Sequence, residues 1–243
     1  LFWYGTWFGR QLSDSDIDSY FADLSKPRHI QHAMVQVGER LSHGQNGSRW
    51  YPRVVAQASS GSLEIRQTAA WIMGQDRGYA PFHEALLKLI HDPEPMVRRN
   101  AALGLAGFGD SASRPELLAM LHPFTVQAAT AGVVRYRLKL GDYVNPGTLL
   151  ARVGETEVRS PAPGEVRSLE KREGETVAPG DAVAELGADS NHVWEALRGL
   201  YLVGTPEDLE AVQRFERPIP GMPETVVQQA KLTAQAIEAK VGK

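Results

Sequence analysis

The residue types in this chain that could do chemistry are few and widely spaced. His29 and His32 lie three residues apart, a spacing that places both imidazoles on one face of a helix. A helical zinc site also needs a glutamate and a third ligand, and this segment lacks both. We therefore predict that His29 and His32 pack or face solvent and hold no metal. No spacing of interest joins the remaining histidines, which are His43, His83, His91, His122 and His192.

The other catalytic motifs are also missing. Cysteine is absent, which excludes disulfides, thiolate metal sites and cysteine nucleophiles. The glycines of residues 104–109 follow the order G-x-x-G-x-G at the end of an expected helix, whereas a dinucleotide-binding loop lies between a strand and a helix. No serine occupies a nucleophile elbow. The sequence therefore predicts a protein that is not an enzyme, with no catalytic, cofactor-binding or metal residues.

The composition is that of an ordinary globular protein. Hydrophobic residues make up 42% and charged residues 23% of the 243 positions, which is enough to bury a substantial core in one or two domains. The 26 basic and 29 acidic residues give a formal charge of −3, which provides no long-range attraction to nucleic acid or anionic lipid. We therefore expect no nucleic-acid partner.

Self-similarity in the first half of the chain indicates which secondary-structure elements this part of the sequence forms. Residues 65–73 (IRQTAAWIM) and 97–105 (VRRNAALGL) share an aliphatic residue, an arginine and a pair of alanines, about 32 residues apart. Residues 92–95 (DPEP) end one helix and begin the next, since proline suits the first turn of a helix. This pattern resembles the second helix of a HEAT repeat. The resemblance implies an α-α superhelix, or solenoid, whose concave surface suits protein binding.

Helix periodicity extends this interpretation in both directions. Residues 30–37 are a weaker earlier copy of the repeated helix. After residue 188 we expect a helix over 192–203, capped by Asp189, Ser190 or Asn191, then one from Thr205 to about Phe215 and a last one from about Pro223 to Ala239. Ahead of that point, helices are expected at about 14–24, 29–42, 49–58, 63–75, 80–91, 95–107 and 112–121.

A different repeat begins at about Phe124. Residues 131–153 (AGVVRYRLKLGDYVNPGTLLARV) and 163–186 (PGEVRSLEKREGETVAPGDAVAEL) match in register, each with a G-[D/E]-x-V-x-P-G turn. Short alternating strands between glycine and proline turns indicate β structure, and two similar halves imply a pseudo-two-fold barrel. Over residues 126–187 the chain resembles the biotinyl/lipoyl domain, which is a barrel-sandwich hybrid.

The resemblance also indicates where a cofactor would be attached. Members that carry biotin or lipoate do so on a lysine at the tip of the hairpin between the two halves. Here that hairpin reads Gly154, Glu155, Thr156 and Glu157, and no lysine lies between Lys139 and Lys171. Without that amine there is nothing to acylate, so we expect no cofactor.

Charges in the β segment are nearly balanced, as on an ordinary solvated surface. Strand alternation places Arg135, Arg137 and Lys139 on one outward face, where they favour solubility. The eight basic residues are Arg135, Arg137, Lys139, Arg152, Arg159, Arg167, Lys171 and Arg172. The nine acidic residues are Asp142, Glu155, Glu157, Glu165, Glu170, Glu173, Glu175, Asp181 and Glu185.

The first residues are rich in aromatic side chains. Residues 1–8 (LFWYGTWF) precede Arg10, an order typical of the interfacial end of a membrane helix. Ten residues cannot span a bilayer, which needs about 20, so we expect an apolar span upstream of Leu1 and association with a membrane. The alternative is a hydrophobic plug on the first helix.

The order of the elements predicts a multidomain α and β protein in which the β domain interrupts the solenoid. The expected helix at 112–121 lacks a partner in the residues that follow it, and a suitable partner occurs at 192–203. We therefore divide the chain into an interfacial segment (1–12), HEAT-like repeats (13–123), a biotinyl/lipoyl-like domain (124–188) and C-terminal helices that complete the array (189–243).

This architecture indicates a scaffold or adaptor with protein partners, because stacked helical repeats create extended binding surfaces. The alternative is an accessory subunit of a biotin- or lipoate-dependent enzyme complex, with the β domain as a degenerate carrier domain.

Overall fold

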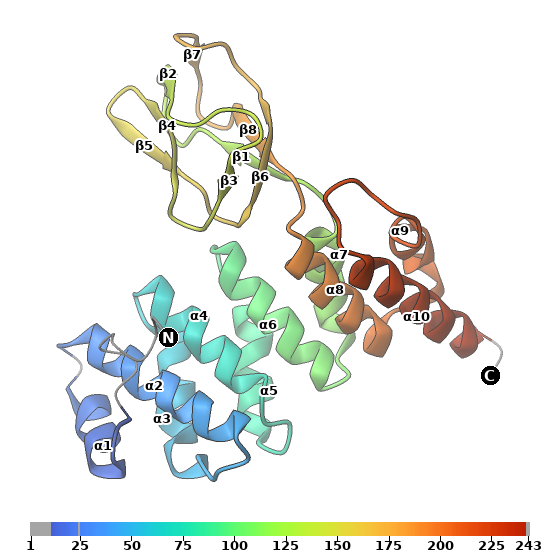
Figure 1. Ribbon diagram of the computed structural model, residues 1–243. Coiled ribbons are helices and arrows are strands. Elements are labelled where there is room, and N and C mark those ends of the chain that lie inside the picture. The colour runs from blue at the N-terminus through green and yellow to red at the C-terminus, as the bar shows by residue number, and fades with distance from the viewer. Residues whose placement is uncertain (1–10, 24, 242–243) are drawn as a thin grey trace. The chain divides into compact units, whose positions relative to one another are not determined.

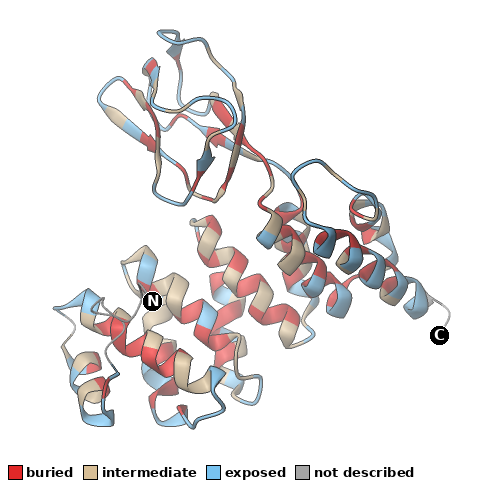
Figure 2. Ribbon diagram, in the orientation of Figure 1, coloured by how far each residue is buried: buried red, intermediate tan, exposed pale blue. Residues whose placement is uncertain are grey.

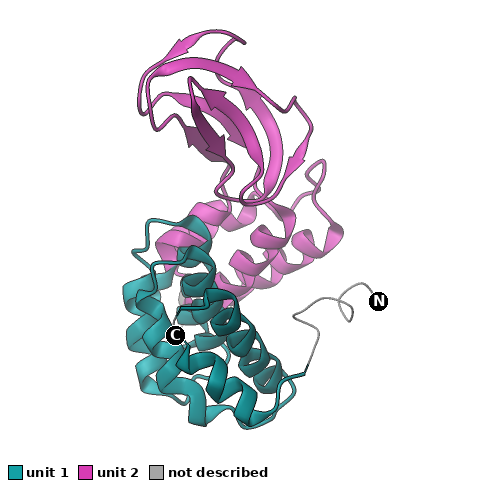
Figure 3. Cartoon of the chain, turned by 90° about the vertical axis from the view of Figure 1, so that its left-hand side faces the viewer, with its two compact units in different colours: residues 1–113 teal, residues 114–243 magenta. Residues whose placement is uncertain are grey.

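The computed structural model describes residues 11–23 and 25–241 and combines helices with a β region (Figure 1). It divides into two compact units, residues 1–113 and 114–243 (Figure 3). The expected interfacial segment lies, except for Gln11 and Leu12, outside the described residues. Within the described ranges, no helix combines the length and apolar composition needed to cross a membrane.

The first unit is helical, as the periodicity predicts. Helix α2 begins at Pro27, two residues before the expected start, because the proline occupies its first turn. The segment expected at 49–58 consists of one α-helix flanked by 3₁₀ turns at 48–50 and 57–59. The helices are α1 (Asp14–Ala22), α2 (Pro27–Ser42), α3 (Tyr51–Ala56), α4 (Leu63–Met73), α5 (Ala80–Leu89) and α6 (Pro95–Gly107).

The second helices of the repeats stack side by side. Helix α2 packs against α4, and α4 packs against α6. Ala33 of α2 and the alanine pairs of α4 and α6 are fully buried, so each helix turns a small, apolar face inward (Figure 2). The chain after α4 approaches α6 closely at Gly74 and Gly104, where a Cβ on Gly74 would lie 2.9 Å from the Cα of Gly104.

Polar contacts also join successive repeats of the first unit. The guanidinium of Arg66 donates to both carboxylate oxygens of Asp92, at 2.7 and 3.0 Å. Its third contact, to the carbonyl of Ser60, lies within its own repeat. Asp92 is 9% exposed, and this pairing satisfies a carboxylate in the loop between α5 and α6.

The α-helices described in the second unit are α7 (Arg114–Met120), α8 (Ser190–Val203), α9 (Leu209–Gln213) and α10 (Glu224–Val241). Helix α7 packs against α8, and α10 covers α8. Asp189 is the N-cap of α8, since its carboxylate accepts the backbone N–H of His192. The helix expected from Thr205 opens as a 3₁₀ turn at Pro206–Asp208 before α9.

The β region lies between α7 and α8 in the chain. Its strands form two four-stranded sheets, ordered β1-β8-β6-β3 and β5-β4-β2-β7. Replacing each strand of the first half by its counterpart in the second half converts one order into the other, so the two sheets are related by a pseudo-two-fold. The strands are β1 (Phe124–Gln127), β2 (Gly132–Tyr136), β3 (Tyr143–Val144), β4 (Leu149–Val153), β5 (Thr156–Arg159), β6 (Gly164–Leu169), β7 (Thr176–Val177) and β8 (Ala182–Leu186).

The inner faces of both sheets share one small aliphatic core. Val134 of β2, Val153 of β4 and Val166 of β6 are at most 1% exposed within it. One detail of the expected face is wrong: β2 ends at Tyr136, so Lys139 lies in the turn beyond the strand. Arg137 still donates its backbone N–H to Leu150, so the pairing with β4 ends between Arg137 and Lys139.

Candidate functional site

The hairpin between the two halves is a tight turn that presents no amine. Val153 and Thr156 are cross-strand partners, which leaves Gly154 and Glu155 as the turn. Gly154 has a φ of 58°, a left-handed conformation that glycine adopts without strain. Glu157 accepts hydrogen bonds from two arginines of the same sheet. The hairpin therefore offers carboxylates, the Thr156 hydroxyl and backbone, and no side-chain amine for an amide-linked cofactor.

The lysines on either side of the hairpin lie on other loops. Lys139 is in the turn between β2 and β3. Lys171 lies between β6 and β7, where its ammonium pairs with the carboxylate of Asp181 at 3.2 Å. Neither lysine is placed at the tip that the resemblance identifies.

His29 and His32 pack against an aromatic ring. The imidazole of His29 stacks on Tyr20, with ring centroids 4.2 Å apart. His32 is 1% exposed, and its ring centroid lies 5.9 Å from that of Tyr20. Among the residues that the structure describes, no group of three histidine, aspartate or glutamate side chains could hold a metal ion.

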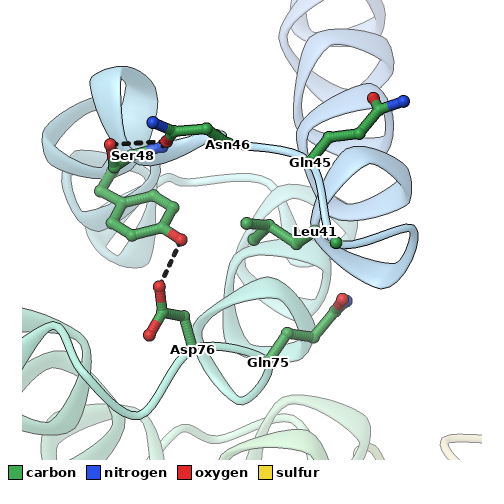
Figure 4. A pocket seen from close by; sticks show the side chains of 9 residues that line it. Leu41, Gln45, Asn46, Ser48, Gln75 and Asp76 are labelled. Atoms are coloured by element: carbon green, nitrogen blue, oxygen red, sulfur yellow. Dashed lines mark hydrogen bonds between the residues drawn. The ribbon is translucent and has the colours of Figure 1, made fainter.

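A polar cavity of about 320 Å³ opens in the first unit between the end of α2 and the loop after α4 (Figure 4). Asn46, Ser48 and Gln75 line it, and Gln75 carries a buried Nε2 that has no hydrogen-bond partner. The carboxylate of Asp76 accepts a 2.6 Å hydrogen bond from the Tyr51 hydroxyl. Since that carboxylate is already engaged, the cavity has no free acid–base pair.

Glu195 on α8 is the described carboxyl group whose pKa is raised. Burial is the larger cause, and the negative charge of Asp189 adds to it. The carboxylate of Asp189 itself accepts from the His192 backbone and from the Tyr143 hydroxyl, at 3.0 and 2.7 Å. Burial and this hydrogen bond raise the pKa of Tyr143 to about 12. The arrangement of Asp189, Tyr143 and His192 caps the N-terminus of α8.

In two successive helix pairs of the first unit, a recurring contact joins the first helix to an aspartate after the second helix. In the α3–α4 pair, the Tyr51 hydroxyl of α3 donates to Asp76, which follows α4. In the next, the Nε2 of His83 on α5 lies 2.7 Å from the carboxylate of Asp110, which follows α6. Both aspartates also accept a backbone N–H from two residues further along. Each contact closes one helix pair.

The same contact recurs in the second unit across a much longer stretch of chain. The guanidinium of Arg114, at the start of α7, donates twice at 2.9 Å to Asp208, which follows α8. Asp208 is 2% exposed. Burial by itself raises its pKa, but hydrogen bonds from Arg114 and from the Thr205 backbone outweigh it and the net shift is downward. Helix α8 therefore takes the place that α4 and α6 hold in their own pairs.

Sequence reasoning did not find these pairs, because tyrosine, histidine and arginine share no pattern. The recurring signal was the aspartate, which follows a glycine-containing helix end in residues 74–76 and 107–110.

A family model of HEAT repeats matches residues 51–134. The match begins at α3, includes α4, α5, α6 and α7, and ends within β2. Its final residues therefore fall on strands at the point where the helical pattern is interrupted. The N-terminal helical part of the chain is thus HEAT-like, as the repeated arginine and alanine pattern predicts. A comparison with curated proteins finds no significant match.

Proposed function

We propose that this chain is a non-catalytic scaffold or adaptor that binds proteins through a HEAT-like array and an inserted β domain. The HEAT-repeat match suggests an interaction role, since such repeats stack into extended surfaces.

The ion pair of Arg114 with Asp208 is the main support for the proposal that the β domain is inserted between α7 and α8. It closes the α7–α8 pair in the manner of Tyr51 with Asp76, although 94 residues separate the two partners. Phe124 and Leu186, at the two ends of the β region, are cross-strand partners. Since both ends leave from neighbouring strands, the β domain can be inserted without separating the two helices. We accordingly assign residues 13–123 and 189–243 to the array and 124–188 to the inserted domain.

We further propose that the inserted domain is a biotinyl/lipoyl-like barrel-sandwich hybrid that has lost its cofactor. Support comes from the exchange of β3 and β7 between the two halves, and from the turn at Gly154 and Glu155 without a lysine. After co-expression with biotin and lipoate ligases, intact-mass analysis is expected to show the unmodified mass. A biotin or lipoyl adduct on any lysine of the domain would overturn this assignment.

Reconstitution tests the scaffold role. Partners captured by the natural full-length protein are purified and titrated against it by calorimetry, with a variant lacking residues 125–188 as the comparison. Saturable binding at micromolar or lower Kd supports a scaffold, and loss of binding in the variant assigns the contact to the β domain. Turnover of a small molecule by the purified chain would contradict the proposal.

The likeness of the β domain to carrier domains supports a second candidate, an accessory subunit of a biotin- or lipoate-dependent enzyme. Competition distinguishes the two proposals. As an accessory subunit, the chain would compete with an authentic carrier domain for its ligase or carboxylase, whereas an unrelated scaffold would not.

Membrane attachment ahead of Leu1 is a separate proposal, supported by the aromatic residues before Arg10. Carbonate extraction of the natural full-length protein tests it. Retention in the pellet supports an anchor, and complete release contradicts one.

A further inference from the structure

The outer surface of the sheet β5-β4-β2-β7 gathers four arginines around one glutamate. Arg135 on β2, Arg152 on β4 and Glu157 on β5 are successive cross-strand partners, so their side chains share a face. Arg159 lies two residues beyond Glu157 on β5, on that same face. Arg137 directly follows the end of β2, and it points to the same side because its neighbours Tyr136 and Leu138 both pack against the core. We call these five residues the arginine face.

The charges of the arginine face are poorly compensated. Arg135 and Arg152 are direct cross-strand neighbours, an arrangement of like charges that destabilises a sheet. Glu157 pairs with Arg152 at 2.8 Å and with Arg159 at 2.6 Å. Within the described part of the chain, Arg135 and Arg137 have no ion pair or side-chain hydrogen bond. The Nε of Arg152 is buried and lacks a hydrogen-bond partner. The face therefore has unused donors and excess positive charge.

The positions related to the arginine face by the pseudo-two-fold carry different charged residues on the other sheet. There the counterpart of Arg152 is Glu185, and the counterpart of Arg135 is Arg167. Arg167 lies 3.5 Å from the carboxylate of Glu165 on its own strand. Two similar halves have thus acquired opposite charges at the same position of β4 and β8, so the fold itself does not require the arginine face.

We propose that the arginine face is a docking site for an acidic protein segment in extended conformation. Guanidinium groups bind carboxylates through paired, charge-assisted hydrogen bonds. In an extended segment, alternate side chains lie about 7 Å apart. We expect about the same spacing between Arg135 and Arg137, because the backbone of Arg137 stays hydrogen-bonded to Leu150 of β4 just beyond the end of β2. Glu155 on the adjoining turn and Glu173, which accepts the Tyr136 backbone N–H, border the face. These carboxylates favour a short acidic segment over a long polyanion such as nucleic acid.

A synthetic peptide with glutamate at every second position, separated by serine, is the probe. Titration into the ¹⁵N-labelled chain at low salt is expected to shift backbone amide signals of β2, β4 and β5 and to leave β1, β6 and β8 unchanged. The glutamine version of the peptide is expected to cause no shifts. Raising the salt to 0.5 M is expected to weaken binding, because exposed charges are then screened within about 4 Å.

The pseudo-two-fold provides a matched control variant. We expect Arg135→Gln to weaken peptide binding about fivefold or more, and its counterpart Arg167→Gln to weaken it less than about twofold. Equal losses in both variants, or no saturable shifts, would overturn the proposal by reducing it to general charge attraction. Tighter binding of a single-stranded oligothymidylate of equal charge would also overturn it.

This inference rests on the proposed docking role of the β domain but can fail separately from it. If a captured partner binds the chain and its affinity is unchanged by Arg135→Gln, the arginine face is not its docking site, while the scaffold role still holds.

Discussion

At the scale of single residues, the aspartates that close the helix pairs differ in how strongly they depend on their donors. The uncharged Tyr51 hydroxyl donates one hydrogen bond to Asp76, whereas the Arg114 cation donates two hydrogen bonds to Asp208. Asp208 is also almost completely buried. Loss of a donor therefore has different consequences in the two pairs, because a buried carboxylate without a cation is costly.

Arg114→Ala is expected to destabilise the second unit by about 3 kcal/mol, since it leaves the buried Asp208 carboxylate without its cation. Tyr51→Phe, the matched change in the α3–α4 pair, is expected to cost about 1 kcal/mol. Urea unfolding combined with hydrogen exchange of the α8 amides measures the first effect. An Arg114→Ala protein with unchanged α8 protection would show that this pair does not hold α7 to α8.

Acid is expected to destabilise the protein through the same carboxylates. The pKa values of Asp92, Asp110 and Asp208 lie below the ordinary value of 3.8. Their stabilisation is therefore complete above pH 3.8 and declines as the pH falls toward the lower folded-state pKa. Thermal melts between pH 6 and pH 2.5 should show this decline, and Asp208→Asn should flatten it. Stability that rises on acidification would contradict the sign.

At the scale of the elements, α4 and α6 meet without intervening side chains at their C-terminal ends. A Cβ on Gly74 would approach the Gly104 backbone to 2.9 Å, closer than real Cβ contacts occur. Since that neighbour is main chain, the helices themselves must move apart to accept it. The glycines here serve close packing between helices.

Gly74→Ala is therefore expected to destabilise the first unit by about 1–3 kcal/mol through overpacking. Gly61→Ala is the control, because a Cβ at Gly61 meets nothing within 4 Å. That variant is expected to be neutral or slightly stabilised. Chemical denaturation of both proteins measures the difference, and equal midpoints would argue against a tight α4–α6 contact.

At the scale of the whole molecule, the inserted domain and the helices that flank it are expected to fold with little dependence on each other. The Cα atoms of Phe124 and Leu186 lie about 5 Å apart as cross-strand partners. The Tyr143 hydroxyl donates to the Asp189 carboxylate, which also accepts the His192 backbone N–H as the cap of α8. We expect Asp189 to go on capping α8 when Tyr143 is absent.

Replacing residues 125–188 with about six glycine and serine residues, long enough to rejoin the two helices, is expected to leave a folded helical protein. The reason is that α7 keeps its packing against α8 and Arg114 keeps Asp208. Circular dichroism should show helical signal and a cooperative melt. A molten remainder would mean that the β domain is part of the helical core.

Much of this architecture could be predicted from the sequence. The arginine and alanine pattern of residues 65–73 and 97–105 predicted the stacked helices α4 and α6, and the two G-[D/E]-x-V-x-P-G turns predicted repeated strands. Such patterns are readable because side-chain periodicity and turn chemistry act over a few residues. The extent of β2 was overestimated, since the alternation of charged residues continues past Tyr136 although the strand pairing does not.

The sequence by itself thus indicated where helices and strands form and showed that no lysine lies between Lys139 and Lys171, because each of these features depends on neighbours along the chain. Only the tertiary structure decided that Asp208 pairs with Arg114, from which it is separated by 94 residues. It also decided that Arg135 lies beside Arg152, whereas Glu185 lies on the other sheet. These contacts depend on which strands and helices come together in space. Charges that balance along the sequence can therefore separate onto different faces once the two halves exchange strands.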